Sequence, residues 1–503
     1  MLGEDPRGLP SAYETACLHH FNGRSDALEL LGEQNEFVAP AGGERSTRIV
    51  GPRRAIAVKG TRVSHQDQVH RASRSNPPTD DGETMFCDTS HPMSRLILVN
   101  ARILTLASKL PGPRRGSAMR DLGVIERGYV VMNEGRIEVV GSGDAPTFNG
   151  DEIDVEGRVV MPAFTDCHTH ACHAGERFAE AAMRLAGTPY LDILAAGGGI
   201  MSTVRSVREA SHDELVEGIR ARLRQMRTTG TAHVEIKSGY GLDSATEFKM
   251  LDAIEEVGRH DLGVISPTFL GAHAIDGDEA AYTARVTDEM LPAVVARYGK
   301  IACDVYCEKS AWPRAAARRL LERAKALGCP LRAHVDQFNE LGFLDDALEL
   351  GARTVDHLEA SSDAAIARVA KSAAIAVLLP GCGLTLDLRF ANGRALIDQG
   401  AAVTIATNLN PGSSPMSSMP LIIALAARFY RMTHEEAIIA ACWNSACALG
   451  IERRTGSIEA GKQADLIVLP SNDERALAYE WGAAVPISTY IGGNLLDCSD
   501  IWC

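Results

Sequence analysis

Short runs of β-branched and other apolar residues recur along the chain from residue 96 onward. The first of them, Leu96–Leu104, Tyr129–Met132 and Arg136–Val140, are separated by turn residues such as Gly135. They predict a small β-sheet near residue 100. The segment Gly456–Leu469 returns to the same apolar character. We therefore expect it to complete that sheet from the other end of the chain.

Between these segments, apolar runs alternate with helical patterns such as Ser211–Arg227 and Pro313–Leu327. Continuous apolar runs are typical of parallel strands that are buried on both faces. About eight such β/α units are present, the number that closes a TIM barrel. We predict an α/β protein with a TIM-type (β/α)8 barrel and a small β-sandwich domain built from the flanking segments. The predicted barrel strands are Val159–Phe164, Ala232–Lys237, Val264–Leu270, Ala302–Cys307, Leu331–Val335, Arg353–His357, Ile375–Leu379 and Val403–Thr407.

The chain is predicted to contain three parts. Residues 1–92 are rich in charged residues, Ser, Pro and Gly and have no sustained periodicity. We expect a disordered N-terminal extension there, or translated sequence ahead of a natural start at Met93, because such a segment buries too little apolar surface to offset its ordering entropy. Residues 93–158 and 455–503 are assigned to the composite β domain, and residues 159–454 to the barrel.

Composition narrows the classes of partner and compartment. Hydrophobic residues make up 45% of the chain and charged residues 23%, which is ordinary for a soluble globular protein. The net charge of -14 argues against nucleic acid and anionic membrane surfaces as partners, but not against a small anion bound by a local arginine. The twelve cysteines include no C-x-x-C pair, and no signal peptide is evident. This favours reduced thiols in a cytoplasmic protein over a disulfide framework.

Histidines follow several of the predicted barrel strands. His168 and His170 are two residues apart at the end of the first strand, so their side chains project to the same side. Active sites of TIM barrels lie where strands end at the C-terminal face. Reading only those ends adds His273, His334 and His357. The pattern predicts a metal-dependent hydrolase; the alternative is histidines that serve only packing.

Nine short segments together resemble the imidazolonepropionase family of the metal-dependent amidohydrolase superfamily. The similarity runs from about Met93 to the C-terminus, and the Glu235–Leu242 and Asn410–Ser413 segments distinguish this family from other amidohydrolases. The remaining matching segments are Asp166–His170, Ala174–Arg177, Gly197–Arg205, Thr268–His273, Ala333–Gln337, Asp356–Leu358 and Leu379–Gly381.

The resemblance implies hydrolysis of the ring C–N bond of 4-imidazolone-5-propanoate to N-formimidoyl-L-glutamate, in histidine degradation. It also implies one Zn²⁺ or Fe³⁺ ion per chain, and leaves a homodimer open. The implied metal ligands are His168, His170, His334 and Asn408, and the implied catalytic residues are His357, Gln337 and Asn408. The implied substrate-binding residues are Arg177, Tyr190, Tyr240, His273, Gln337, Asn410, Gly412 and Ser413.

Asn408 departs from the family pattern, which has Asp at this position as metal ligand and proton acceptor. Asn can bind a metal through its carbonyl oxygen, but it brings no charge and cannot accept a proton. A second departure is Cys172-His173, which we interpret as packing, with a second pair of soft ligands as the alternative. Two other functions stay open: an amidohydrolase for a different cyclic amide or amidine, and a metal-poor pseudoenzyme that serves as a binding protein.

Overall fold

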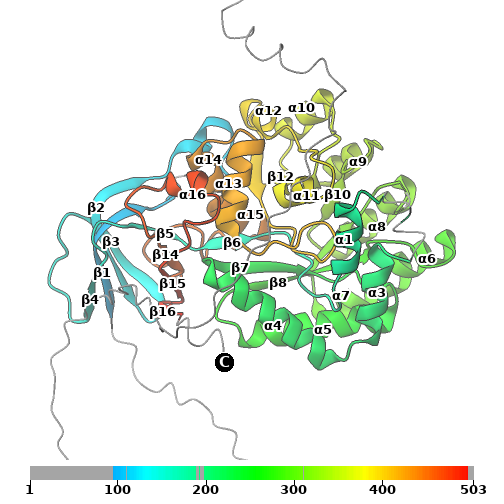
Figure 1. Ribbon diagram of the computed structural model, residues 1–503, viewed down its shortest axis with the longest axis horizontal. Coiled ribbons are helices and arrows are strands. Elements are labelled where there is room, and N and C mark those ends of the chain that lie inside the picture. The colour runs from blue at the N-terminus through cyan, green and yellow to red at the C-terminus, as the bar shows by residue number, and fades with distance from the viewer. Residues whose placement is uncertain (1–94, 109, 189–191, 193–196, 310, 497–503) are drawn as a thin grey trace, which may run out of the picture. The chain divides into compact units, whose positions relative to one another are not determined.

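The computed structural model describes residues 95–496, apart from 109, 189–191, 193–196 and 310. The extension predicted over residues 1–92 lies outside these residues, as does Tyr190. Two four-stranded parallel sheets, in the orders β6-β7-β8-β9 and β10-β11-β12-β13, form the barrel wall (Figure 1). Their strands are β6 Phe164–Asp166, β7 Thr231–Lys237, β8 Ile265–Ala272, β9 Ala302–Val305, β10 Arg332–Val335, β11 Thr354–His357, β12 Ile375–Leu378 and β13 Ala402–Ile405.

Backbone contacts join the two sheets along both seams. Parallel bridges from Cys303 to Leu331 and from Tyr306 to His334 connect the β9 edge with the β10 edge. At the other seam, the amide of Asn408 donates to the carbonyl of His168 at 3.1 Å, and the amide of His170 donates to Leu409 at 2.9 Å. The predicted barrel is therefore closed, and its second seam lies at the His-x-His segment.

Helices connect the barrel strands and pack outside them. The helix predicted over Ser211–Arg227 is α4, which starts with a capping box in which the Ser211 side chain accepts from the amide of Glu214. The helices in this part are α1 Phe178–Leu185, α3 Ile200–Glu209, α4 His212–Thr228, α5 Ser244–His260, α6 Glu279–Arg285, the π-helix η2 Val286–Met290, α7 Leu291–Tyr298, α8 Arg314–Leu327, α9 Phe343–Leu350, α10 Asp363–Lys371, α11 Pro380–Thr385 and α12 Gly393–Asp398. They are followed by α13 Met419–Phe429, α14 His434–Ile439, the π-helix η3 Ala440–Asn444, α15 Ser445–Leu449 and α16 Ala476–Tyr479.

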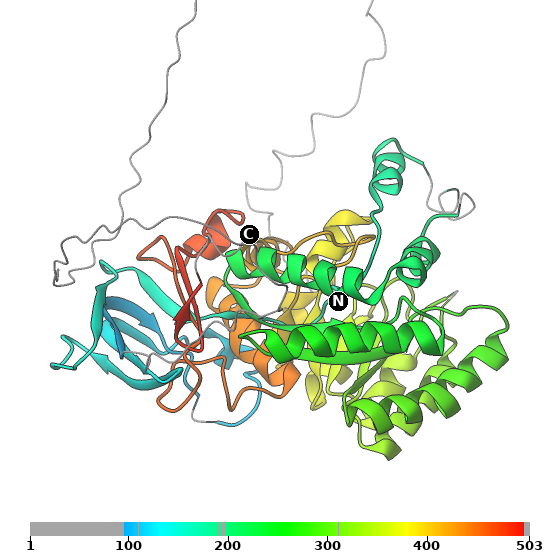
Figure 2. The same ribbon diagram turned by 90° about the horizontal axis from the view of Figure 1, so that it is seen from below.

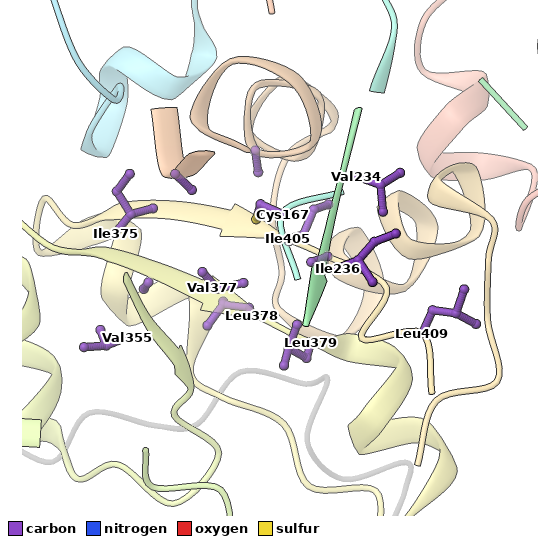
Figure 3. Packing of buried hydrophobic residues seen from close by; sticks show 14 of the residues in the cluster. Cys167, Val234, Ile236, Val355, Ile375, Val377, Leu378, Leu379, Ile405 and Leu409 are labelled. Atoms are coloured by element: carbon purple, nitrogen blue, oxygen red, sulfur yellow. The ribbon is translucent and has the colours of Figure 1, made fainter. Parts of the chain in front are cut away.

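The barrel strands share one apolar core with the surrounding helices. Figure 3 shows buried side chains that β7, β11, β12 and β13 contribute to it, including Ile236, Val355, Val377 and Ile405. The described cysteines are buried and unpaired, as expected for reduced thiols. Within residues 95–496, no helix combines the length and apolar character needed to cross a membrane.

Segments from both ends of the described chain build a second, eight-stranded sheet, ordered β16-β15-β14-β5-β1-β2-β3 with β4 paired to β1. Figure 2 shows its red C-terminal strands beside the blue and cyan N-terminal ones. The predicted return of Gly456–Leu469 is confirmed only over β14. The bounds are β1 Leu96–Leu104, β2 Val124–Asn133, β3 Arg136–Ser142, β4 Asp151–Asp154, β5 Val159–Pro162, β14 Leu466–Val468, β15 Ser488–Ile491 and β16 Asn494–Leu495, with the 3-10 helix η1 at Gly116–Arg120.

The apolar run predicted as one barrel strand, Val159–Phe164, is divided between the two sheets. β5 pairs with β1 and β14 in the small sheet, whereas β6 pairs with β7 in the barrel. The chain changes partners at Ala163, whose amide donates to Asp465, while the next amide, of Phe164, donates to Gly230. This junction joins the small sheet directly to the strand that ends at His168.

An ionic group lies inside the barrel. Lys237 is fully buried, and its Nζ lies 2.7 Å from Glu235 Oε1 and 2.8 Å from Asp304 Oδ2. Removing one partner of such a group leaves an uncompensated buried charge, which costs far more than a surface ion pair contributes.

Lys237→Met is therefore expected to destabilise the fold by about 3–5 kcal/mol. The measurement is urea unfolding of the variant beside the natural protein, followed by circular dichroism. Lys325→Met, at an exposed position of α8, is the matched control and should change stability by about 0.5 kcal/mol or less. Equal stability of the two variants would contradict the ionic role of Lys237.

Candidate active site

Three imidazoles converge at the C-terminal ends of the barrel strands. His168 and His170 follow β6, and His334 lies on β10. Their ligand nitrogens all lie within 4.8 Å of one another, and the ring centroids of His168 and His334 are 4.5 Å apart. One ring nitrogen of each histidine is buried without a hydrogen-bond partner. Buried polar atoms are almost always paired, so these three nitrogens indicate a site for a cation.

Two buried carboxylates orient these rings. Asp356 Oδ2, on β11, lies 2.6 Å from His168 Nδ1, and Asp304 Oδ1, on β9, lies 3.2 Å from His334 Nδ1. In each case the unpaired atom is the opposite nitrogen, Nε2. Such carboxylate–imidazole pairs fix the tautomer and direct the free lone pair toward a metal.

The electrostatics keep the imidazoles neutral. Burial, together with the positive charge of Lys237 and the neighbouring rings, lowers the pKa of His168 and His170 well below the usual value. Burial also lowers the pKa of His334, although Asp304 opposes it. A neutral imidazole offers the lone pair that a metal requires. Three neutral nitrogens in a buried position fit a borderline cation such as Zn²⁺.

Asn408 lies just after β13 with an unusual backbone conformation. Its φ is 53°, and its side-chain Oδ1 is buried without a hydrogen-bond partner. His357 and Leu358, at the end of β11, have φ values of 83° and 72°. Such values are uncommon for residues other than glycine and cluster at functional sites. The free amide oxygen of Asn408 is suited to serve as a neutral ligand.

His357 lies beside the three-histidine group, with its ring centroid 5.3 Å from that of His334. Its Nδ1 is 3.2 Å from Glu359 Oε1. Burial lowers the pKa of His357, but Glu359 and Cys382 outweigh burial and raise the pKa to about 10. An unperturbed imidazole titrates near neutrality. Instead, the carboxylate favours a protonated ring.

A guanidinium lies against the Asn-Pro-Gly-Ser turn at the mouth of the barrel. Arg177 Nε lies 3.0 Å from Glu180 Oε2, and a Cβ on Gly412 would lie 2.1 Å from Arg177 Nη1. The absence of a Cβ at Gly412 lets the guanidinium pack directly on this turn. Asn410 Oδ1 accepts from the amides of Gly412 and Ser413 at 2.8 and 2.7 Å and holds the turn in shape.

Two further rings, of His273 and Tyr240, lie beside His170. The ring of His273, which follows β8, stacks on His170 with a centroid distance of 4.8 Å and an interplanar angle of 17°. The ring of Tyr240 is 5.1 Å from His273. His273 Nδ1 lies 3.0 Å from the carbonyl of Gly239, and burial lowers its pKa to about 3. A neutral His273 therefore presents its other nitrogen as a hydrogen-bonding group.

Comparison with known proteins identifies the family. The amidohydrolase family matches residues 159–496. An imidazolonepropionase of Herpetosiphon aurantiacus is 44% identical over 74% of this chain and 90% of its own length. Another, of Chloroflexus aggregans, is 43% identical over 79% of this chain and 96% of its own. The chain belongs to the imidazolonepropionase family of amidohydrolases.

Solved structures share the fold of this imidazolonepropionase-family chain at low sequence identity. Guanine deaminase of E. coli has a TM-score of 0.61 at 15% identity and covers 80% of this chain and 99% of its own. An adenosine deaminase from Xanthomonas campestris with bound zinc has a TM-score of 0.59 at 18% identity and covers 81% of this chain and 95% of its own. These similarities confirm the predicted barrel architecture.

The structure brings most of the predicted site residues to one end of the barrel. The exception is Tyr190, which lies outside the described residues. Cys172 and His173 belong to neither group of three metal-ligand side chains among the described residues; Cys172 Sγ lies 3.9 Å from the carbonyl of Met250, and His173 Nδ1 lies 3.0 Å from that of His170. Their interpretation as packing residues agrees with these contacts.

The residues that hold the site in place were not predicted from the sequence. Asp304 and Asp356 orient His334 and His168, and Glu359 and Cys382 contact His357. The sequence did contain a signal for them. Asp304 and Asp356 are carboxylates within predicted barrel strands, and Asp356 directly precedes His357. Strand alternation alone, however, does not say which imidazole a carboxylate reaches.

Asp356→Asn is expected to weaken metal binding by about 10–100-fold, because the amide no longer supports the imidazole of His168 with a charge. The measurement is competition for Zn²⁺ between the metal-free protein and a chromophoric chelator. Asp346→Asn provides the control, since Asp346 pairs with Arg314 and Arg318 on the outer helices. An unchanged affinity in Asp356→Asn would rule out this supporting role.

Proposed function

We propose that this protein hydrolyses the ring C–N bond of 4-imidazolone-5-propanoate and releases N-formimidoyl-L-glutamate in histidine degradation. The observation that carries the proposal is the convergence of His168, His170 and His334, each with an unpaired buried nitrogen, in a chain of the imidazolonepropionase family. The buried, unpaired thiols and the net charge of -14 support a cytoplasmic enzyme for a small molecule, without nucleic acid or membrane as partners.

One Zn²⁺ or Fe³⁺ ion per chain is proposed, held by His168, His170, His334 and Asn408. When bound, such an ion supplies Lewis-acid chemistry that makes water nucleophilic near pH 7. Asn408 contributes its unpaired carbonyl oxygen rather than a carboxylate. The ligand set is consequently neutral, and the carboxylate that the family pattern has at this position as a proton acceptor is absent.

Substrate orientation is assigned to the residues around the barrel mouth. The planar fork of Arg177 suits the propanoate carboxylate, which joins Glu180 as an anionic partner of this guanidinium. Tyr240 and His273 flank the ring on one side. The turn of Asn410, Gly412 and Ser413 offers backbone and side-chain hydrogen-bonding groups on the other side of the substrate ring. The family pattern adds Tyr190 to the substrate-binding residues.

Proton delivery is assigned to His357. With its pKa raised to about 10 beside Glu359, this ring carries a proton at neutral pH. It donates that proton to the ring nitrogen that leaves when the C–N bond breaks. The side-chain amides of Asn408 and Gln337 do not ionise, so neither transfers a proton. Gln337 is therefore assigned to orienting the substrate by hydrogen bonding.

The test is turnover of 4-imidazolone-5-propanoate by purified protein of known metal content. Loss of the substrate's ultraviolet absorbance should accompany the appearance of N-formimidoyl-L-glutamate, and removal of the metal with a chelator should abolish both. Metal-loaded protein without turnover would contradict the proposal, and protein that neither takes up metal nor turns over the substrate would favour the metal-poor pseudoenzyme. Turnover of a different cyclic amide or amidine alone would favour the second alternative.

The same assay separates the role of Arg177 from that of the metal ligands. Arg177→Ala should raise KM by roughly tenfold or more, because an ion-paired hydrogen bond contributes about 1.5–3 kcal/mol, and kcat should change less. Its metal content should stay unchanged. Arg220→Ala, on the outer surface of α4, is the control. Loss of metal in Arg177→Ala would instead make Arg177 part of the structural support.

Asn408→Asp should bind the metal more tightly, by roughly tenfold or more, because an anionic ligand replaces a neutral one at the cation. Turnover should be at least as fast, since the carboxylate also accepts a proton and a lower water pKa gains little once it is about 7. The measurements are metal titration and initial rates for both proteins side by side. A variant that binds metal less tightly and turns over more slowly would show that the site is adapted to the amide.

A further inference from the structure

A second group of metal-ligand side chains lies next to the three-histidine group. It consists of His357 at the end of β11, Glu359 two residues later, and Cys382 on α11. One ligand atom from each lies within 4.8 Å of the others. Cys382 is 1% exposed, and the side chains of His357 and Glu359 are 2% and 4% exposed. We call these three residues the cysteine cluster.

The partners within the cysteine cluster leave one strong acceptor unsatisfied. Glu359 Oε1 lies 3.2 Å from His357 Nδ1, whereas Glu359 Oε2 is buried without a hydrogen-bond partner. Cys382 Sγ accepts a hydrogen bond from the Gln337 amide at 3.3 Å. A buried carboxylate oxygen without a donor is costly, so its presence points to a cation that completes the cluster.

The donor set selects the class of cation. Ca²⁺ and Mg²⁺ bind oxygen ligands, whereas a thiolate, an imidazole and a carboxylate together suit Zn²⁺ and related thiophilic ions. The 3.2 Å between the His357 and Glu359 ligand atoms is close to the edge of a tetrahedron with metal–ligand bonds of about 2.1 Å. We propose that the cysteine cluster binds a second divalent ion of the Zn²⁺ class, separate from the ion of the three histidines.

Metal binding to the cysteine cluster is expected to inhibit the enzyme. This expectation rests on the proposed function, in which His357 delivers a proton. An imidazole that binds a metal must give up the proton on that nitrogen. The ring is then neutral, and the N–H on its other nitrogen is a much weaker acid than a protonated ring, so His357 no longer delivers a proton to the leaving nitrogen. The second ion therefore inhibits the enzyme, and the thiol of Cys382 makes this inhibition specific to thiophilic metals.

Co²⁺ titration of the metal-free, full-length protein tests the binding. Co²⁺ bound to a thiolate gives a charge-transfer band in the near ultraviolet, whereas Co²⁺ bound only to histidines does not. The natural protein should bind two equivalents and develop this band. Cys382→Ser should lack the band and still bind one equivalent, which shows that the variant is folded. Cys329→Ser, at a buried thiol elsewhere in the barrel, should keep both equivalents and the band.

Binding of only one equivalent by the natural protein, or a band that persists in Cys382→Ser, would overturn the second site. Glu359→Gln provides an independent variant and should weaken the second equivalent by roughly tenfold or more.

Inhibition is then measured as the fraction of each variant's own rate that excess Zn²⁺ removes. Cys382→Ser should need roughly tenfold more Zn²⁺ than the natural protein or Cys329→Ser. Equal sensitivity would overturn the inhibitory role. If no protein turns over the substrate, the proposed function fails, while the Co²⁺ titration still decides whether the cysteine cluster binds metal.

Discussion

The candidate metal site depends on a buried ion pair and on the neutral imidazole that is hydrogen bonded to it. Lys237 binds Asp304, Asp304 lies against His334, and His334 presents its other nitrogen to the centre of the site. Lys237 and Asp304 offset the cost of burying each other's charge, because an isolated charge in this environment would be strongly unfavourable. Asp356 supports His168 in the same way from the neighbouring strand. The orientation of these two imidazoles is thus fixed by side chains inside the barrel rather than by the loops at its mouth.

The junction between the two sheets positions the first two ligands. β5 belongs to the small sheet and β6 to the barrel, with only Ala163 between them. The His-x-His segment that follows is hydrogen bonded across the closing seam to Asn408 and Leu409. Asp166 adds a side-chain bond across the same seam, since its Oδ2 accepts from the hydroxyl of Thr407 at 2.5 Å. The small sheet therefore anchors the strand from which the barrel closes.

Asn408 and the cysteine cluster give the site an unusual balance of charge. The ligands around the three-histidine centre are neutral, whereas the carboxyl groups of Asp304, Asp356 and Glu359 lie one contact further out. In this arrangement negative charge stabilises the rings rather than the ion itself. It also explains the raised pKa of His357, whose nearest charged neighbour is a carboxylate.

The sequence by itself determined the alternation of strands and helices and the strand ends near which His168, His170 and His334 lie. These features follow from local periodicity, so the barrel and the positions of its candidate ligands could be predicted. The expected same-side projection of His168 and His170 from strand alternation does not apply, because β6 ends at Asp166 and both residues follow it. The division of the Val159–Phe164 run into two strands could not, because an apolar strand is compatible with either sheet and only hydrogen-bond partners far along the chain choose between them.

Only the tertiary structure decided how the site residues are paired. Asp356 and His168 are 188 residues apart, and Cys382 reaches His357 from a helix that follows a different strand. Periodicity indicates the face on which a side chain lies, but it carries no information on which distant strand closes against it. The pKa of His357 depends on such contacts, and so does the unpaired oxygen of Glu359. Barrel closure creates them, because it is the step that brings strand ends from the whole chain to one mouth.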